Sequence, residues 1–217
     1  MPKIEWDKIG ERLYETGLDH VVLYDLVDGA YTNGVAWNGV TSMNENKSGA
    51  EPSPLYADNI KYLVLKSIEE YGLTLECYTY PQEFEKCNGV TQLAKGVTIG
   101  QQVRNSFGLS FRTLIGNDIV GENFGYKLHL VYGCDASPSE ESNSTINDSP
   151  EAKTLSYEIT TTPVAVKNAK NTSCVTINST ECDSEKLAAL EKILYGDEEN
   201  APRLPLPDEI ATLFAEG

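Results

Sequence analysis

Histidine is scarce in this sequence, which limits the chemistry that the chain can perform. Its 217 residues include two histidines, His20 and His129, so few side chains are available as a catalytic base or a metal ligand. His129 alternates with Leu128 and Leu130 and is interpreted as an exposed strand residue, and His20 as a loop residue. The phosphate-binding loop, the nucleophile elbow and the zinc-binding helix motif are absent as well. We therefore expect no catalytic residues, no metal, no cofactor and no enzymatic activity.

Positive charge is also scarce. The chain has 17 Lys and Arg residues against 33 Asp and Glu residues, which gives a net charge of −16. A nucleic-acid reader needs clustered basic side chains for phosphate contacts, and binding to an anionic membrane needs the same side chains. The composition argues against both functions.

Long apolar runs are missing. No run is long enough to span a bilayer, and the N-terminal residues lack the apolar core of a signal peptide. We expect a protein that is made and kept in a cytoplasm. The cysteines agree, because they are odd in number and no pair has the C-x-x-C spacing. We predict free, mostly buried thiols at Cys77, Cys87, Cys134, Cys174 and Cys182.

Strand patterns account for most of what is present. The composition, 40% hydrophobic and 23% charged, is that of one globular domain with terminal arms. A β-branched and aromatic hairpin is predicted at 20–27 and 35–42, with its turn in the segment GAYTNG. The nearly continuous apolar run at 60–68 is typical of a strand buried on both faces. Further strands are predicted at 73–80, 107–115, 125–132, 154–166 and 174–177, and this number of strands favours a β-sandwich or barrel.

Helices and loops complete the predicted fold. One or two helical turns are predicted from Pro81 to Gly89, and a longer helix from Asp183 or Ser184 to Gly196. The polar, proline-containing run from Met43 to Pro54 is predicted to be a long loop between two strands, and 135–151 a surface loop. We divide the chain into an N-terminal arm (1–19), a β-sandwich domain (20–180) with a protruding loop (43–58), and a C-terminal helix with an acidic arm (181–217).

Three stretches in sequence order resemble a known family. They are YETGLDHVVLYDL (14–26), the segment from GVAWNGV to EKCNG (34–89) and PRLPLPDEI (202–210). They resemble the major tail proteins, or tail tube proteins, of long-tailed bacteriophages that infect Gram-positive bacteria. The likeness covers nearly the whole chain and is densest over 31–89 and 202–210.

The resemblance implies a structural role. In that family a β-sandwich subunit forms hexameric rings, and the rings stack into the tube through which the genome leaves the virion. The resemblance implies a tape measure protein inside the tube during assembly, and tail terminator and distal tail proteins at its ends. It also implies assembly in the bacterial host cytoplasm, a final location in the virion, and DNA that passes through without specific binding.

The resemblance also assigns roles to residues. The protruding loop is expected to reach the neighbouring ring, and we hypothesise that it orders only on assembly; its residues are Asn44, Glu45, Asn46, Lys47, Ser48, Gly49 and Glu51. The C-terminal arm is expected to bury its apolar side chains along a neighbouring subunit or ring, the alternative being a frayed terminus. These side chains are Leu204, Leu206, Ile210, Leu213 and Phe214.

The surface that lines the channel is less sharply defined by the sequence. Thr74 and Glu76 alternate with apolar neighbours and are our candidates for the lumen. Arg112, Lys127 and His129 alternate in the same way, and the exterior is the stronger assignment for Lys127. An acidic or neutral lining would let DNA slide. The alternative function is a monomeric β-sandwich that binds carbohydrate or protein, which the twelve tyrosines favour slightly.

Overall fold

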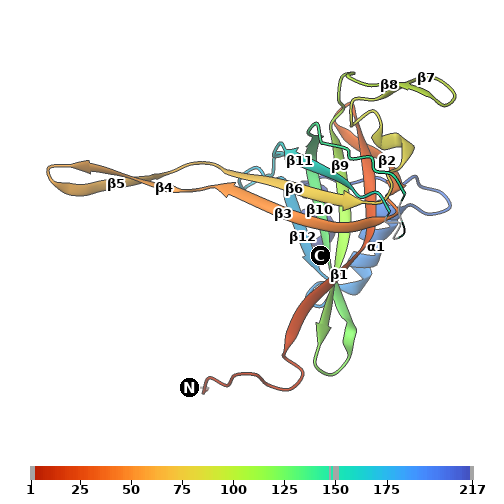
Figure 1. Ribbon diagram of the computed structural model, residues 1–217. Coiled ribbons are helices and arrows are strands. Elements are labelled where there is room, and N and C mark those ends of the chain that lie inside the picture. Colours follow the sequence, from red (N-terminus) through yellow and green to blue (C-terminus); the bar gives the residue numbers. More distant parts are fainter. Residues whose placement is uncertain (1–2, 147, 149–151, 216–217) are drawn as a thin grey trace.

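The computed structural model describes residues 3–146, 148 and 152–215, and antiparallel strands are the largest class of structure among them (Figure 1). The main sheet has the strand order β2-β1-β9-β10-β11-β6-β3, with β12 paired to β10, and two hairpins, β4-β5 and β7-β8, stand apart from it. This confirms the mainly β fold. The elements are β1 (Leu13–Val27), β2 (Ala30–Ala36), β3 (Val40–Gly49), β4 (Pro52–Ala57), β5 (Ile60–Lys66), β6 (Glu69–Cys77), the 3₁₀ helix η1 (Gln82–Phe84), β7 (Thr91–Ala94), β8 (Val97–Ile99), β9 (Phe107–Asn117), β10 (Gly121–Ala136), β11 (Leu155–Thr161), β12 (Cys174–Asn178), α1 (Ser184–Tyr195) and α2 (Pro207–Phe214).

The sheet curls so that two of its parts face each other across an inner core. Strands β1, β9 and β10 supply one side of this core and β6 and β11 the other, with Trp37 and Phe84 among the aromatic residues between them. The opposite face of β1 and β10 forms a second core, which α1 and α2 cover. The central strands β9 and β10 are therefore buried on both faces over much of their length.

The sheet forks at Gly133. The N-terminal part of β10, up to Val131, pairs with β12, and the part from Cys134 onward pairs with β11. Gly133 has a φ of +58°, and a Cβ there would lie 2.2 Å from the carbonyl oxygen of Thr162. The amide of Thr162 donates a hydrogen bond to the Gly133 carbonyl at 2.8 Å. Only glycine fits this close approach, which lets one strand serve both cores.

The first hairpin is tighter than the sequence indicated. Asp28 and Gly29 have φ angles of +50° and +82°, so a two-residue primed turn joins β1 to β2. The predicted GAYTNG turn is wrong, because most of that segment belongs to β2. A second turn separates β2 from β3 and interrupts the predicted strand at 35–42. Strand β1 begins at Leu13, so the predicted arm of residues 1–19 is also too long.

The C-terminal helix follows the prediction at both ends. The carboxylate of Asp183 accepts hydrogen bonds from the amides of Glu185 and Lys186, at 2.8 and 3.1 Å, and Gly196 ends α1. The predicted helix at 81–89 shortens to the three-residue η1. Residues 137–146 form no helix or strand, as predicted for the loop 135–151, of which 147 and 149–151 lie outside the described residues.

The thiols are free, as predicted. Cys77, Cys87 and Cys134 are buried, and Cys174 and Cys182 are half-buried. Burial raises the pKa of Cys87 to about 12 and that of Cys134 well above its usual range. Since the thiolate is the reactive form, these cysteines behave as small apolar core residues.

Candidate assembly surfaces

The run predicted to be a long loop is instead the start of a projecting β-arm. Strand β3 pairs with β6 from Val40 to Gly49, and the chain continues into the β4-β5 hairpin, which we call the ribbon (Figure 1). The loop prediction for 43–58 is therefore wrong, because β6 provides hydrogen-bonding partners for the polar residues of β3. Of the residues assigned to ring stacking, Asn44, Glu45, Asn46, Lys47, Ser48 and Gly49 lie in β3, and Glu51 lies in the connection to β4.

The residues of β3 alternate between two environments. The side chain of Asn46 donates to Thr74 Oγ1 at 2.9 Å on the solvent side of the sheet. Glu45 reaches the other side, where Oε1 lies 3.5 Å from Nδ1 of His129. Lys47 Nζ lies 5.9 Å from the centroid of the Tyr71 ring. Glu45 and Lys47 thus anchor the base of the arm to its own domain.

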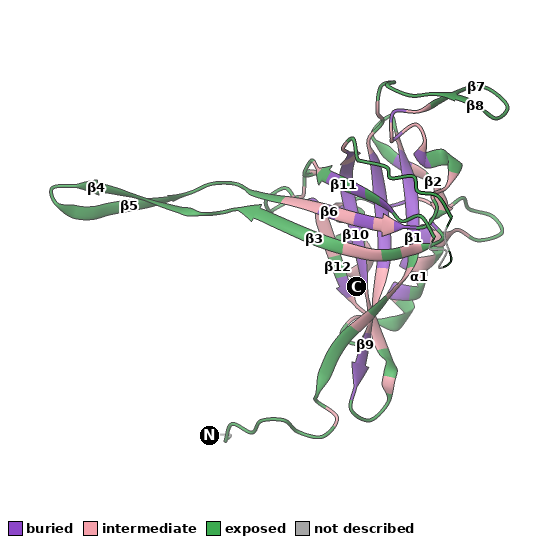
Figure 2. Ribbon diagram, viewed as in Figure 1, coloured by how far each residue is buried: buried purple, intermediate pink, exposed green. Residues whose placement is uncertain are grey.

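The ribbon exposes apolar side chains to solvent. Every residue of β4 and β5 is exposed (Figure 2), with Tyr56 at 71% and Tyr62 at 67%. The prediction that 60–68 is buried on both faces is wrong, because nothing in the described part of the chain packs over β5. An isolated two-stranded hairpin is only marginally stable in water, and a contiguous apolar patch marks an interaction surface.

The sequence contains local signals that predict the hairpin of the ribbon. Asp58 and Asn59 both have positive φ angles, +50° and +64°, and form a two-residue turn between two apolar runs, which is a strong local hairpin signal. At the other end Gly49 has a φ of +81°, and a Cβ there would lie 2.2 Å from the Ile68 carbonyl oxygen. This glycine allows β3 to pass into the ribbon beside the return of the chain into β6.

Thr74 and Glu76 lie on the solvent face of β6, opposite the buried Leu73 and Leu75. Ser42 Oγ donates to Glu76 Oε2 at 3.0 Å. The strand registers place side chains from three strands on this surface, which we call the polar face. Its residues are Ser42, Asn44, Asn46 and Ser48 of β3, Glu70, Gly72, Thr74 and Glu76 of β6, and Ser156, Glu158 and Thr160 of β11; none is Lys or Arg.

The other candidates for the lumen lie elsewhere. Arg112 makes hydrogen bonds to both carboxylate oxygens of Asp19, at 2.9 and 3.1 Å, and stacks on the ring of Tyr126 at 4.6 Å. Lys127 pairs with Glu15. Both side chains project from β9 and β10, away from the polar face. Thr74 and Glu76 therefore share a surface with other neutral and acidic residues only.

His129 is buried, so its prediction as an exposed strand residue is wrong. It is 9% exposed and its ring stacks on Phe111 with centroids 4.6 Å apart. Nε2 lies 2.9 Å from Thr113 Oγ1, and burial lowers the pKa of His129. Alternation with two leucines does not identify an exposed position here, because β10 is covered on both sides.

The C-terminal segment covers its own domain. Leu204 is 2% exposed and Ile210 is also buried, both within the core beneath α1, and the half-buried Leu213 and Phe214 pack on the same core. The prediction that this arm buries these side chains on a neighbouring subunit is therefore wrong, and so is the alternative of a frayed terminus. Leu206 alone of the five remains exposed, at 42%.

The same segment closes one edge of the sheet. The amide of Gly34 donates to the Pro202 carbonyl and that of Leu204 donates to the Tyr31 carbonyl, each at 3.1 Å. Strand β2 is thus capped along its outer edge. Strand β3, at the other end of the sheet, has β6 as its one neighbour among the described strands. An open edge of this kind is a template for pairing with another chain.

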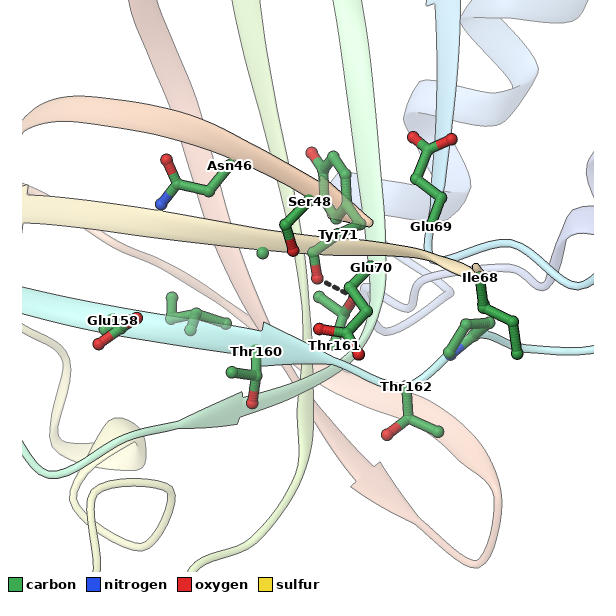
Figure 3. Close-up of a pocket in the computed structure, with 13 residues that line it drawn as sticks. Asn46, Ser48, Ile68, Glu69, Glu70, Tyr71, Glu158, Thr160, Thr161 and Thr162 are labelled. Atoms are coloured by element: carbon green, nitrogen blue, oxygen red, sulfur yellow. Dashed lines mark hydrogen bonds between the residues drawn. The ribbon is translucent and has the colours of Figure 1, made fainter. Parts of the chain in front are cut away.

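A groove lies at the base of the arm, where the first residues of β6 extend past the C-terminal end of β11 (Figure 3). The last pair of these two strands is Thr160 with Gly72, and Thr161 Oγ1 donates to the Tyr71 carbonyl at 2.6 Å. The groove has a volume of about 550 Å³. Its lining consists of Asn46, Ser48, residues 68–72 and residues 158–163.

Within residues 3–146, 148 and 152–215, no cluster of three or more His, Cys, Asp or Glu side chains is arranged to hold a metal ion. In the same residues, no helix has the length and apolarity needed to cross a membrane.

Comparison with known proteins gives structural matches and no sequence match. No protein-family model matches the chain, and no curated protein sequence matches it. A solved structure described as the cryo-EM structure of the anti-feeding prophage (AFP) baseplate, 6-fold symmetrised, contains a chain with a similar course. The match covers 80% of this chain and 97% of the baseplate chain, with a TM-score of 0.37 and 8% sequence identity.

Proposed function

We propose that this chain is a structural subunit of a bacteriophage tail, which forms hexameric rings that stack into the tail tube. The observation that carries the proposal is the ribbon, whose exposed apolar side chains need a covering surface that the described chain does not supply. The sequence resemblance assigns residues 43–58, which include β4 of the ribbon, to contacts between rings. In this role the protein belongs to the virion and is assembled in the bacterial host cytoplasm.

The polar face is suited to the lining of a DNA channel. It presents hydroxyl, amide and carboxylate groups from three strands and no basic side chain. A cationic lining would hold DNA by counterion release, whereas a neutral or acidic one lets the genome pass. The open edge of β3 allows the sheets of neighbouring copies to continue around the ring. A tape measure protein inside the tube, and terminator and distal tail proteins at its ends, are the further partners we propose.

The role is mechanical, and we propose no enzymatic activity. The runner-up, a monomeric carbohydrate-binding module, relies on exposed aromatic residues. Tyr24, Tyr132 and Tyr157 are buried in the cores, and Tyr56 and Tyr62, which are more exposed than Tyr14 and Tyr78, lie on the ribbon. These positions favour the assembly role.

Removal of the ribbon tests the proposal. Gly49 and Glu69 are paired neighbours, so replacing residues 50–68 by Asn-Gly would close the β3-β6 hairpin with a short turn. We expect a folded domain with an unchanged far-ultraviolet circular dichroism shape but without rings or tubes. Negative-stain microscopy over rising concentration, with the intact chain as control, gives the readout.

Two results would contradict the proposal. One is a full-length chain that stays monomeric at every concentration and binds glycans. The other is a ribbonless variant that still forms tubes of normal length.

A further inference from the structure

The ribbon differs in charge from the rest of the chain. Strand β4 contains no charged residue, and the charged residues of β5 are Lys61 and Lys66. The nearest acidic residues, Glu51 and Asp58, lie in the connections at the two ends of the ribbon. The paired strands thus carry positive charge only, in a chain whose net charge is −16. An acidic surface that lacks basic residues would attract them.

The groove at the base of the arm has the complementary character. Glu69, Glu70 and Glu158 line it, and none of its lining residues is Lys or Arg. Ile68 and Pro163 add exposed apolar surface, which suits the apolar side chains of the ribbon. Glu70, Gly72, Glu158 and Thr160 belong to both the groove and the polar face, so an occupant of the groove would cover this end of the polar face. Thr74 and Glu76 do not belong to the groove lining, so they would stay free to line the channel.

The backbone at the groove is open to a further strand at Glu69 and Glu70, whereas the Tyr71 carbonyl already accepts a hydrogen bond from Thr161 Oγ1. Beyond its last pair with β11 at Gly72, β6 continues through Glu69–Tyr71 with β3 as its remaining neighbour. On the ribbon, Pro52 and Pro54 interrupt the donors along β4, whereas β5 contains no proline. The outer edge of β5 is therefore the edge that can add a strand to another sheet.

We infer that the ribbon of one copy binds in the groove of a second copy, with Lys61 and Lys66 placed against Glu70 and Glu158. The inference rests on the proposed function and names the acceptor of the arm. The ribbon projects away from the main sheet (Figure 1), whereas the groove lies at the base of the arm, so the occupant comes from another molecule. Because the ribbon and the groove are different surfaces, the contact is heterologous and generates rings or filaments.

Charge reversal on each side provides the test. The variant Lys61→Glu/Lys66→Glu has an acidic ribbon and an acidic groove, and the variant Glu70→Lys/Glu158→Lys has a basic ribbon and a less acidic groove. We expect each alone to raise the concentration needed for assembly at least about 10-fold, because like charges across an interface repel. Mixed in equal amounts they form complementary contacts, and assembly should return to within about 3-fold of the unchanged chain.

Matched controls change the same charges elsewhere. Lys167→Glu/Lys170→Glu and Glu198→Lys/Glu199→Lys alter exposed residues outside the ribbon and the groove, and both should assemble as the unchanged chain does. Sedimentation velocity and negative-stain microscopy measure the assembly.

The outcomes separate the two proposals. If tubes form and both reversals are neutral, or if the mixture is no better than its components, the groove is not the acceptor although the tube role stands. If the unchanged chain forms rings or filaments that never become tubes, while the mixture still rescues that assembly, the acceptor is correct and the tube role is wrong.

Discussion

At the level of single residues, the base of the arm is held by a polar cluster inside the curled sheet. His129 lies 3.5 Å from Glu45 of β3 and 2.9 Å from Thr113 of β9. Burial lowers the pKa of His129; the charges of Glu45 and Glu15 act against this shift, and those of Lys127 and Lys47 act with it. The arm is thus tied to the domain core through a histidine that favours its neutral form.

This arrangement predicts a dependence of stability on pH. The folded-state pKa of His129 lies below the unfolded value of about 6.5, so between these two values the unfolded chain binds more protons. Stability should therefore fall as the pH drops below about 6.5 through this window. Urea unfolding of His129→Gln, which keeps a hydrogen-bonding side chain, should show a smaller loss between pH 7.5 and 5.5 than the unchanged chain. Equal losses in the two proteins would contradict the prediction.

At the level of elements, the C-terminal segment provides a comparison between two leucines two residues apart. Leu204 is buried against the core, and Leu206 is 42% exposed. We expect Leu204→Ala to lower the free energy of unfolding by about 2–5 kcal/mol, and Leu206→Ala to lower it by less than about 0.5 kcal/mol. Urea titration of the ribbonless monomer measures both changes without interference from assembly. Similar losses for the two leucines would mean that the segment does not pack as described.

Local signals were enough to predict some elements. The carboxylate of Asp183, the leucine stripe of α1 and the glycine at 196 act within one helix, so its two ends followed from the sequence. Alternation with Leu73 and Leu75 likewise placed Thr74 and Glu76 opposite the core. Their polar neighbours on β3 and β11 depend on strand registers between segments far apart in sequence, which no local pattern specifies.

Other elements were predicted wrongly because their partners were not local. The polar residues 44–49 form a strand because β6 supplies their hydrogen bonds. The sequence of β5 predicts a core strand, because its apolar pattern shows that the strand needs to be covered but not which molecule covers it. The ribbon, the segment with the clearest need for a partner, was therefore the segment that the sequence pattern alone misplaced.

At the level of the whole molecule, the two edges of the main sheet are treated differently. Residues 202–204 cap β2, whereas β3 keeps an open edge next to the polar face. The ribbon leaves the domain from this open side (Figure 1). In the proposed tube, further copies would therefore contact this side of the subunit, and the helix-covered core would stay closed.

The proposed lumen can be tested by reversing one charge on the polar face. Glu76→Lys adds a basic side chain to every subunit along the channel, and Glu198→Lys makes the same change in the loop after α1, away from the polar face. Tubes of Glu76→Lys assembled with a short DNA duplex should retain at least about 10-fold more nuclease-protected DNA than unchanged tubes at low salt, and release it as salt rises. Glu198→Lys tubes should bind DNA, if at all, only in a nuclease-accessible form. Equal protection in the two variants would mean that net charge causes the effect and that the polar face does not line the channel.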